Sequence, residues 1–570
     1  MFVLAVMGII ISNMEIINFK LNYETVRGNK MKRLLVLIIT LLTLTALLTG
    51  CANTPKTTGS DNVIRATIAS EPKTLDPSLN NALDGGNYIL CAFEGLTRIG
   101  KDGNIVAGAA ESWETSPDGL VWTFHIRKDA KWSDGKDVTA NDFIYAWKRT
   151  VDPKTAADYA YYIYFIKNGE KINAGEADID TLGVKALDEK TLEVTLENPC
   201  PFFTEIVAFP ALVPQREDIV SADKDKWALN PSTYIGNGPY KLTAWEHDSK
   251  ITFEKNDNYW DKDSIVAPKI EWYLMNDQNA ILSAFKNGQV VYAKNIPSDE
   301  LAAEKQAGNL KIQPLLGTYY LDFVNNKPPF DNVKVRKAFS LAIDRNYLVE
   351  TVKKGGEKPA TGYVPYGISD VNPEPDFRTT GGDYISVKPE DYEKNVQEAK
   401  KLLAEAGYPD GKGFPKVTFG LNSGAGHEPI AEAVQQMWKE NLGVEVEILA
   451  QEWNVFQQSR KDGVYNINRN GWIGDYMDAS TFLDMFTTGN GQNNAKYSNP
   501  KYDELISSAR KEADPAKRIQ FYHEAEKLLM DDAAIAPLYY YTEPVVISPK
   551  LQGVVNTKLG FVLFNWASLK

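Results

Sequence analysis

The chain has 570 residues, of which 43% are hydrophobic and 24% are charged, an ordinary composition for a globular protein. This length exceeds the size at which single hydrophobic cores stop growing, so we expect two or three domains. The formal net charge of −13 is spread along the chain. It argues against a nucleic-acid partner, because phosphate binding needs a basic surface.

The N-terminal part of the chain predicts export. A positive "MKR" at 31–33 precedes an uncharged run at 34–50 that is rich in Leu, Ile and Thr. The run ends in "LTGC", which resembles the bacterial lipobox, whose cysteine receives diacylglycerol on sulfur and is acylated on its new amine. A retained anchor helix is the alternative, but the run is short for a membrane span.

We therefore expect a signal peptide over 31–50, lipidation of Cys51 and a polar tether over 51–61. Residues 1–30 are expected to be an over-extended start, with Met31 as the functional one. The protein would then lie on the extracytoplasmic face of the bacterial cell membrane, held there by its lipid.

The remaining two cysteines, Cys91 and Cys200, are too few for a disulfide-built exported protein. We expect two separate buried thiols; a single disulfide between them is the alternative.

The body of the chain alternates strand patterns with helix patterns. Alternation of polar and apolar residues predicts strands, and apolar residues at helical spacing predict helices. The strands are expected at 63–69, 121–127 and 191–199, and the helices at 138–149, 331–356 and 393–411, with a helix, a glycine stop and a strand over 429–453. This mixture predicts an α/β protein.

Two of these segments carry finer signals. Trp122, Phe124 and Ile126 would share the buried side of their strand. Thr139 and Asp142 have the spacing of a capping box, which would begin the helix there.

Enzyme motifs do not occur in the sequence. It contains no H-E-x-x-H, no G-x-S-x-G, no Walker A loop and no dinucleotide glycine fingerprint, and its four histidines are far apart. Asp475 and Asp478 could form a carboxylate pair, but no nucleophile or base lies near them in sequence. We expect no enzyme, no cofactor and no metal.

Five blocks of sequence, in order, resemble the extracellular solute-binding proteins of family 5, which feed peptide ABC importers. The resemblance runs from about Val63 to the C-terminus and is strongest to the oligopeptide-binding branch. The blocks are 109–149, 236–261, 319–345, 398–409 and 468–483, the last reading "NRNGWIGDYMDASTFL".

This resemblance implies a two-lobed α/β fold of the periplasmic-binding-protein type II, with an extra domain inserted in lobe I. Lobe I would comprise three separate segments, the inserted domain one segment, and lobe II one segment. The segments of lobe I would be 62–94, 227–316 and 543–570. The inserted domain would be 95–226, and lobe II would be 317–542.

The resemblance also implies a site for the peptide's free amine. The family aspartate that holds this ammonium group matches Asp475. From the motif alone, Asp475 could instead cap a helix starting near Ala479 or pair with an internal arginine. A family ligand contact matches Tyr159, and family pocket walls match Trp453 and Trp472; each of the three could instead be ordinary packing. Trp472 and Tyr476 would shape the surroundings of Asp475 and limit water there.

Four further positions match family residues that meet peptide C-termini of different lengths: Lys353, His427, Arg460 and Arg469. The alternatives are surface charge for Lys353 and Arg460, an internal ion pair for Arg469 and an exposed loop for His427.

The sequence departs from the family at two places. An acidic residue near the amine in some relatives is aligned with Asn81, and Asp84 is a candidate substitute. A cysteine pair of some relatives corresponds to Gly317 and Ile473, so that disulfide cannot form here.

The leading hypothesis is a lipid-anchored, monomeric receptor that captures oligopeptides and delivers them to an ABC permease complex in the membrane. A peptide-signal (pheromone) receptor of the same fold is the first alternative, and an extracellular peptidase the second. Nickel or haem binding is weaker, because no His or Cys cluster supports it.

Overall fold

The computed structural model describes residues 62–68, 71–72, 74–224, 226–372, 375–423 and 426–570. The expected signal peptide, Cys51 and the tether lie outside these residues. The described residues belong to one structural unit, Asn62–Lys570. None of its described helices has both the length and the apolar character that a membrane crossing would require.

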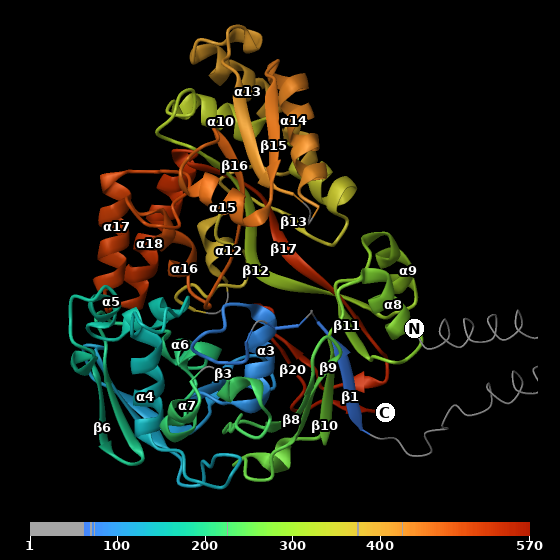
Figure 1. Ribbon diagram of the computed structural model, residues 1–570. Helices are drawn as coiled ribbons and strands as arrows, with labels where there is room; N and C mark the ends of the chain where they lie inside the picture. The colour runs from blue at the N-terminus through green and yellow to red at the C-terminus, as the bar shows by residue number, and fades with distance from the viewer. Residues whose placement is uncertain (1–61, 69–70, 73, 225, 373–374, 424–425) are drawn as a thin grey trace, which may run out of the picture. The chain divides into compact units, whose positions relative to one another are not determined.

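An eleven-stranded mixed sheet runs through this unit (Figure 1). Its strands, in spatial order, are β15 (Val446–Gln451), β14 (Val417–Asn422), β16 (Ile467–Ile473), β12 (Leu310–Phe323), β17 (Ile535–Ile547), β11 (Tyr292–Lys294), β1 (Val63–Thr67), β10 (Lys269–Tyr273), β9 (Lys250–Lys255) and β8 (Tyr240–Glu246), with β13 (Lys358–Pro359) paired to β17. The predicted first strand is confirmed as β1.

Two long strands connect the two lobes. β12 and β17 pair antiparallel from Leu310 opposite Val546 to Asp322 opposite Ile535, with a register shift between Pro314 and Thr318. One end of this ribbon packs against α8 (Gln278–Lys286) and the other lies in the cores of the second lobe. Figure 1 shows both strands running between the upper and the lower part of the molecule.

A smaller four-stranded antiparallel sheet lies within the predicted inserted domain. Its strands, in spatial order, are β4 (Ala110–Thr115), β5 (Val121–Ile126), β7 (Thr191–Thr195) and β6 (Val184–Asp188). In β5 the residues Trp122, Phe124 and Ile126 are buried while their neighbours are not, which confirms the predicted alternation. Next to it, α4 (Ala140–Val151) begins with the capping box of Thr139 and Asp142, as predicted.

The helices of the second lobe confirm most of the periodic patterns. α13 (Tyr392–Glu405) ends just before Gly407, whose φ is +98°, and α14 (Glu428–Leu442) ends at Gly443, with φ +68°, before β15. Glycine tolerates these left-handed conformations without a side-chain clash.

The single helix predicted over 331–356 is wrong. The structure has α10 (Val333–Leu341), a short α11 (Arg345–Tyr347) and a π-helical turn (Leu348–Lys353). The break occurs because the Asp344 carboxylate accepts a hydrogen bond from the Tyr347 N–H at 3.0 Å and starts a new helix there.

The other helices connect and cover the sheets. They are α3 (Leu83–Ala92), α5 (Gly169–Asn173), α6 (Phe203–Ile206), α7 (Glu217–Ala222), α9 (Leu301–Gln306), α12 (Phe377–Gly381), α15 (Trp453–Lys461), α16 (Ser480–Leu483), α17 (Pro500–Lys511) and α18 (Pro515–Asp531).

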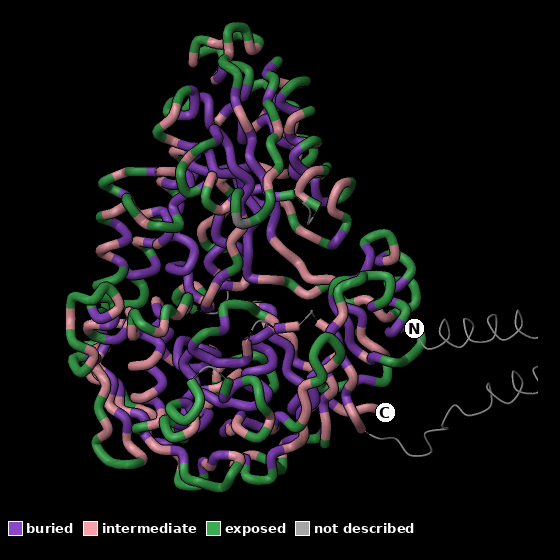
Figure 2. Tube along the Cα trace, in the orientation of Figure 1, coloured by how far each residue is buried: buried purple, intermediate pink, exposed green. Residues whose placement is uncertain are grey.

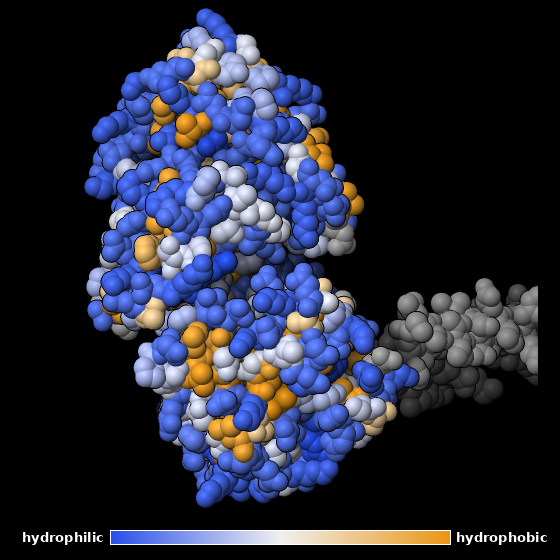
Figure 3. Space-filling model, turned by 90° about the vertical axis from the view of Figure 1, so that its left-hand side faces the viewer, coloured by the Kyte–Doolittle hydropathy of each residue, from blue (hydrophilic) through white to orange (hydrophobic). Residues whose placement is uncertain are grey.

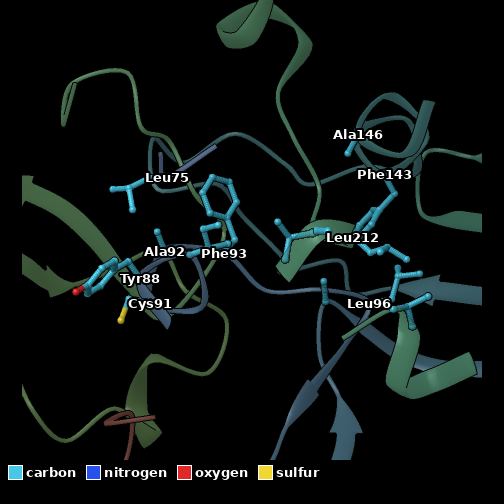
Figure 4. Close-up of a cluster of buried hydrophobic side chains, with 14 of the residues drawn as sticks. Leu75, Tyr88, Cys91, Ala92, Phe93, Leu96, Phe143, Ala146 and Leu212 are labelled. Carbon is cyan, nitrogen blue, oxygen red and sulfur yellow. The ribbon is translucent and has the colours of Figure 1, made fainter. Parts of the chain in front are cut away.

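Buried segments follow the strands and the inner faces of the helices (Figure 2). In the largest core, α3 contributes Tyr88, Cys91 and Ala92, and Phe93 follows directly after the helix (Figure 4). Cys91 and Cys200 are both buried and unpaired, so the expectation of two separate thiols is confirmed. On the face shown in Figure 3, the upper part is mostly hydrophilic and apolar residues gather in the lower part.

Candidate functional site

The segment from Gly474 to Ala479 leaves the end of β16 and enters α16. The Gly474 N–H donates to the Leu316 carbonyl at 2.7 Å, and a Cβ on Gly474 would meet the Leu316 side chain at 2.9 Å. On β16 itself, a Cβ on Gly471 would lie 2.2 Å from the Tyr541 hydroxyl. Both glycines therefore permit close packing that a larger residue would prevent.

Asp475 belongs to this segment, and its carboxylate has no cationic partner among the residues that the structure describes. The Tyr161 hydroxyl hydrogen-bonds to it, and burial raises its pKa to about 7. Among the residues that the structure describes, no Lys, Arg or His forms a salt bridge with Asp475. A carboxylate held in this way gains stability from any cation that reaches it.

The two alternatives considered for Asp475 were capping a helix and pairing with an internal arginine. Its neighbour Asp478 makes both of these interactions instead. The Asp478 carboxylate accepts the Ser480 N–H at 2.9 Å at the start of α16, and it pairs with Arg518 at 2.7 Å. Burial works to raise the pKa of Asp478, but the Arg518 guanidinium and further hydrogen bonds hold it below its usual value. The two carboxylates therefore have different tasks and do not form an acid–base pair.

Tyrosines from the inserted domain surround Asp475. The Tyr162 hydroxyl donates to the Asp475 main-chain carbonyl at 2.6 Å. Tyr159 packs edge-on against Tyr161, with ring centroids 5.8 Å apart, and burial followed by the Asp475 charge raises its pKa to about 12. The structure thus brings Tyr159 and Asp475 together.

Tyr476 packs against aromatic residues of the predicted inserted domain, among them Tyr162, whose ring centroid lies 6.3 Å away. The ring of Tyr476 stacks on Phe202, with centroids 4.9 Å apart, and packs edge-on against Phe165 at 5.7 Å. One residue further on, the Met477 N–H donates to Glu205 at 2.8 Å, and burial raises the pKa of Glu205 to about 7. The residues that follow Asp475 are thereby fastened to the predicted inserted domain.

Asn81 forms a hydrogen bond with an acidic residue, Asp158. Its side-chain amide donates to the Asp158 carboxylate at 2.6 Å, next to Tyr159. Asp84 uses one carboxylate oxygen to accept the Gly85 N–H at 2.7 Å. Asp158 also raises the pKa of Tyr159, so it contributes negative potential near that tyrosine.

A second group of predicted site residues lies around Arg469, on the same strand β16. The Arg469 guanidinium is buried and donates to the Asn422 side-chain oxygen at 2.8 Å. It lies 5.6 Å from the ring of Trp453 and 6.0 Å from that of Tyr319. No salt bridge joins Arg469 to a carboxylate within the described ranges, so the internal ion pair considered for it is wrong.

His427 and Lys353 also belong to the group of residues around Arg469. The Tyr319 hydroxyl and His427 Nδ1 are 3.3 Å apart, and burial together with the Arg469 charge lowers the pKa of His427 to about 4. His427 is therefore neutral at physiological pH. The Lys353 ammonium lies 3.6 Å from Glu357 and 5.9 Å from the Tyr539 ring.

Arg460 is not a surface charge, because it is only 7% exposed. It donates to the Asn470 side-chain oxygen at 2.6 Å and faces the buried Asp322, whose pKa burial raises to about 6. Of the two tryptophans on the predicted pocket walls, Trp453 is 43% exposed and Trp472 packs partly buried against the second lobe's core.

The structure bears on two expectations, one about a disulfide and one about metal sites. Gly317 and Ile473, the two positions at which a disulfide was excluded, lie directly opposite each other between β12 and β16. Among the described residues, no group of three or more His, Cys, Asp or Glu side chains is arranged to hold a metal ion.

Some residues of this site were missed by sequence reasoning. Tyr161 and Tyr162 belong to the aromatic run "DYAYYIY", in which only Tyr159 was singled out. Asn422 and Glu357 have no sequence signal of their own, because they contact their partners only through folding.

The arrangement is that of a binding protein for a molecule with two opposite charges. Among the residues that the structure describes, a cation without an acid lies on β16 and an acid without a cation lies just beyond the end of that strand, and each is lined by aromatic rings. Such a pair of sites can hold the ammonium and the carboxylate of one extended ligand.

Comparison with known proteins agrees with this class. The model of the bacterial extracellular solute-binding proteins, family 5, matches residues 104–494. The chain is 39% identical to the oligopeptide-binding protein OppA of Bacillus subtilis over 509 residues, covering 88% of this chain and 92% of that protein. The chain belongs to family 5 of the bacterial extracellular solute-binding proteins, as the sequence blocks predict.

Solved structures show the same fold. The Haemophilus influenzae OppA complex with the peptide RPPGFSPFR has a TM-score of 0.74 and 32% identity, covering 90% of this chain and 99% of that one. The pheromone receptor PrgZ has a TM-score of 0.73 and 27% identity, covering 90% and 100%. The two-lobed type II binding fold is confirmed, and the protein is a binding protein, not an enzyme.

Proposed function

We propose that this protein captures oligopeptides between its two lobes and delivers them to an ABC permease. The observation that carries the proposal is the Asp475 carboxylate, which has a hydrogen bond from Tyr161, a raised pKa and no cationic partner in the described part of the chain. A peptide's α-ammonium group supplies the missing positive charge. The relatives named as oligopeptide-binding proteins support this ligand class.

The Arg469 group supports binding at the other end of the ligand. Arg469 bonds to a neutral amide and keeps its positive charge uncompensated by a salt bridge among the described residues. A peptide carboxylate can form a two-pronged hydrogen bond with a guanidinium group. Between the two ends, main-chain hydrogen bonds would hold an extended peptide whatever its side chains.

Calorimetry with matched peptides tests the proposal. We expect a peptide with a free amine to bind, and its N-acetylated form to bind roughly ten- to a hundredfold more weakly, because a charge-assisted hydrogen bond contributes about 1.5–3 kcal/mol. Equal affinity for both forms would refute amine recognition by Asp475. Intact peptide eluted from the purified protein would support the ligand class independently.

A peptide-signal receptor is the second candidate, favoured by the structural similarity to the pheromone receptor PrgZ. A nutrient receptor would bind many sequences with similar affinity, because it recognises the main chain and the ends. Affinity confined to one sequence in a peptide library would favour the signal receptor.

Anchoring by lipid at Cys51 and an extracytoplasmic location complete the proposal. They rest on the signal-like sequence of residues 31–51. Mass spectrometry of the N-terminal peptide would show diacylglycerol on Cys51, and a Cys51→Ala variant would be released from the membrane fraction. Membrane-bound wild-type protein whose Cys51 carries no lipid would contradict lipid anchoring.

A further inference from the structure

We infer that Arg518 is a positioning residue for the recognition of the peptide amine. It lies on α18, and its guanidinium pairs with Asp478 rather than with Asp475. It nevertheless holds the segment that carries Asp475 by two separate routes. The inference rests on the proposed function and adds what fixes the amine-binding carboxylate in place.

The first route begins with a two-pronged bond between Arg518 and Asp478. The two terminal nitrogens of the guanidinium donate to the two carboxylate oxygens at 2.8 and 2.7 Å, and both side chains are almost completely buried. Because a planar guanidinium forms two parallel bonds, it fixes the direction of the carboxylate as well as its position. Burial works to raise the pKa of Asp478, but the Arg518 charge and hydrogen bonds hold it below its usual value, so the acid stays ionised.

Asp478 is linked to Asp475 through the start of α16, which lies beside α18 (Figure 1). The Asp478 carboxylate accepts the Ser480 N–H at 2.9 Å, and the Asp475 N–H donates to the Thr481 hydroxyl at 3.0 Å. These bonds close the loop between the two acids, and Arg518 is bonded to that loop at Asp478. A displacement of Asp478 would therefore also displace the backbone of Asp475.

The second route passes through an aromatic ring. The Arg518 guanidinium lies 5.2 Å from the ring centroid of Phe202, within the range of a cation–π contact. The Phe202 ring stacks on Tyr476, the residue next to Asp475, with centroids 4.9 Å apart. The guanidinium also lies 4.9 Å from the ring of Tyr522, on its own helix, which helps to fix it in place.

Asp475 needs support from elsewhere because its carboxylate must remain available to a ligand. The Tyr161 hydroxyl hydrogen-bonds to it, and no Lys, Arg or His of the described residues forms a salt bridge with it. A cation close enough to orient this carboxylate would also neutralise it and compete with the peptide's ammonium group. A cation on the nearby Asp478 provides rigidity without that competition.

The test compares the wild type with Arg518→Met. Calorimetry would use one peptide in two forms, with a free amine and with an N-acetyl group. The ratio of the two affinities is the readout, because it reports recognition of the ammonium group and does not change with a general loss of stability. Arg378→Met is the matched control, since it removes an arginine from another buried ion pair of the second lobe, the pair with Glu526.

A double variant avoids the new buried charge that Arg518→Met creates. In Arg518→Met the Asp478 carboxylate is left without its cation, which lowers stability and places a second bare acid near Asp475. Arg518→Met/Asp478→Asn contains neither charge, and the asparagine oxygen can still accept the Ser480 N–H at the start of α16. Thermal denaturation of each variant shows whether it is folded. If Arg518→Met does not fold, the double variant decides the question.

We expect the wild type and Arg378→Met to bind the free amine roughly ten- to a hundredfold more tightly than the acetylated form. In Arg518→Met and in the double variant this ratio should fall to about threefold or less, because a misplaced carboxylate forms a weak bond with the ammonium group. The loss should fall on the free-amine peptide. Arg518→Lys keeps the charge but not the two-pronged bond, so its ratio should lie between those of the wild type and Arg518→Met.

A wild-type ratio in folded Arg518→Met, or in the double variant, would overturn the inference. An equal fall of the ratio in Arg378→Met would also overturn it, because the loss would then follow from destabilisation alone. Equal affinity of the wild type for the two forms of the peptide would instead refute recognition of the amine by Asp475, the proposed function on which the inference depends.

Discussion

The ring of Tyr476 lies stacked on the ring of Phe202, with centroids 4.9 Å apart and an interplanar angle of 12°. Phe202 belongs to the predicted inserted domain, whereas Tyr476 follows a strand of the second lobe by a few residues. The contact fixes the residue next to Asp475, so the position of the candidate amine-binding carboxylate depends on both parts of the chain.

Replacing Asp475 by Asn should remove recognition of the peptide amine. We expect a roughly ten- to a hundredfold loss of affinity for free-amine peptides, because the charge-assisted bond contributes about 1.5–3 kcal/mol. The melting temperature should not fall, since the isosteric amide removes a buried charge without a salt-bridge partner. On one preparation, calorimetry measures the peptide affinity and thermal denaturation measures the melting temperature. Unchanged affinity would show that Asp475 does not bind the amine.

Peptide affinity should fall as the pH drops below 7. The pKa of Asp475, about 7 in the ligand-free fold, lies above its ordinary value of 3.8, so a proton competes with the ammonium group on the acid side. We expect a decrease on the order of tenfold per pH unit below 7. Asp475→Asn should flatten this dependence, and calorimetry across that range tests it. Because the pKa of Glu205 is also about 7, this residue could contribute to the same pH dependence. Calorimetry on Glu205→Gln measures that contribution.

The same raised pKa has a consequence for stability. Between pH 3.8 and 7 the folded protein binds a proton at Asp475 that the unfolded chain releases, so this residue's contribution to stability falls as the pH rises. Asp475→Asn should therefore be more stable than wild type above pH 7, and the difference should vanish below pH 4. Urea denaturation at several pH values measures it, and an equal free energy of unfolding above pH 7 would contradict it.

Truncating Phe202 to Ala should destabilise the fold by about 3–5 kcal/mol, because a stacked aromatic side chain is lost from a core. It should also weaken peptide binding, since the segment bearing Asp475 loses its support. Tyr476→Phe is the matched control: it keeps the stacked ring and removes only a long hydrogen bond of 3.3 Å with Ser480. If Phe202→Ala binds peptides like wild type, the stacking contact does not position Asp475.

The ion pair between Arg378 and Glu526 should be important for stability. Both side chains are fully buried, and Glu526 also accepts the N–H groups of Tyr363 and Val364 at 2.9 and 2.8 Å. Arg378→Met should cost about 3–5 kcal/mol, since it leaves a buried charge uncompensated.

An exposed pair provides the comparison for Arg378. Lys401→Met breaks the pair with Glu398, whose side chains are 62% and 47% exposed. We expect it to cost at most about 1 kcal/mol, because solvent screens such pairs. Urea denaturation measures both variants, and equal costs would contradict the role given to the buried pair.

The sequence alone predicted the elements whose signals are local. The alternation in β5, the capping box of α4 and the glycine stops after α13 and α14 depend on neighbouring residues, and all are confirmed. The break at Asp344 was missed because apolar spacing continues past it. A side chain that caps a new helix there competes successfully with that spacing.

For the site, the sequence determined that one carboxylate lies between glycines and aromatic rings, and the ordered blocks indicated its family. Only the tertiary structure decided that Asp478, and not Asp475, receives Arg518 and starts a helix. It also decided that Glu357 compensates Lys353 while Arg469 keeps its charge. The physical reason is that burial and pairing of a charge depend on groups far apart in the chain, which only folding brings within a few ångströms.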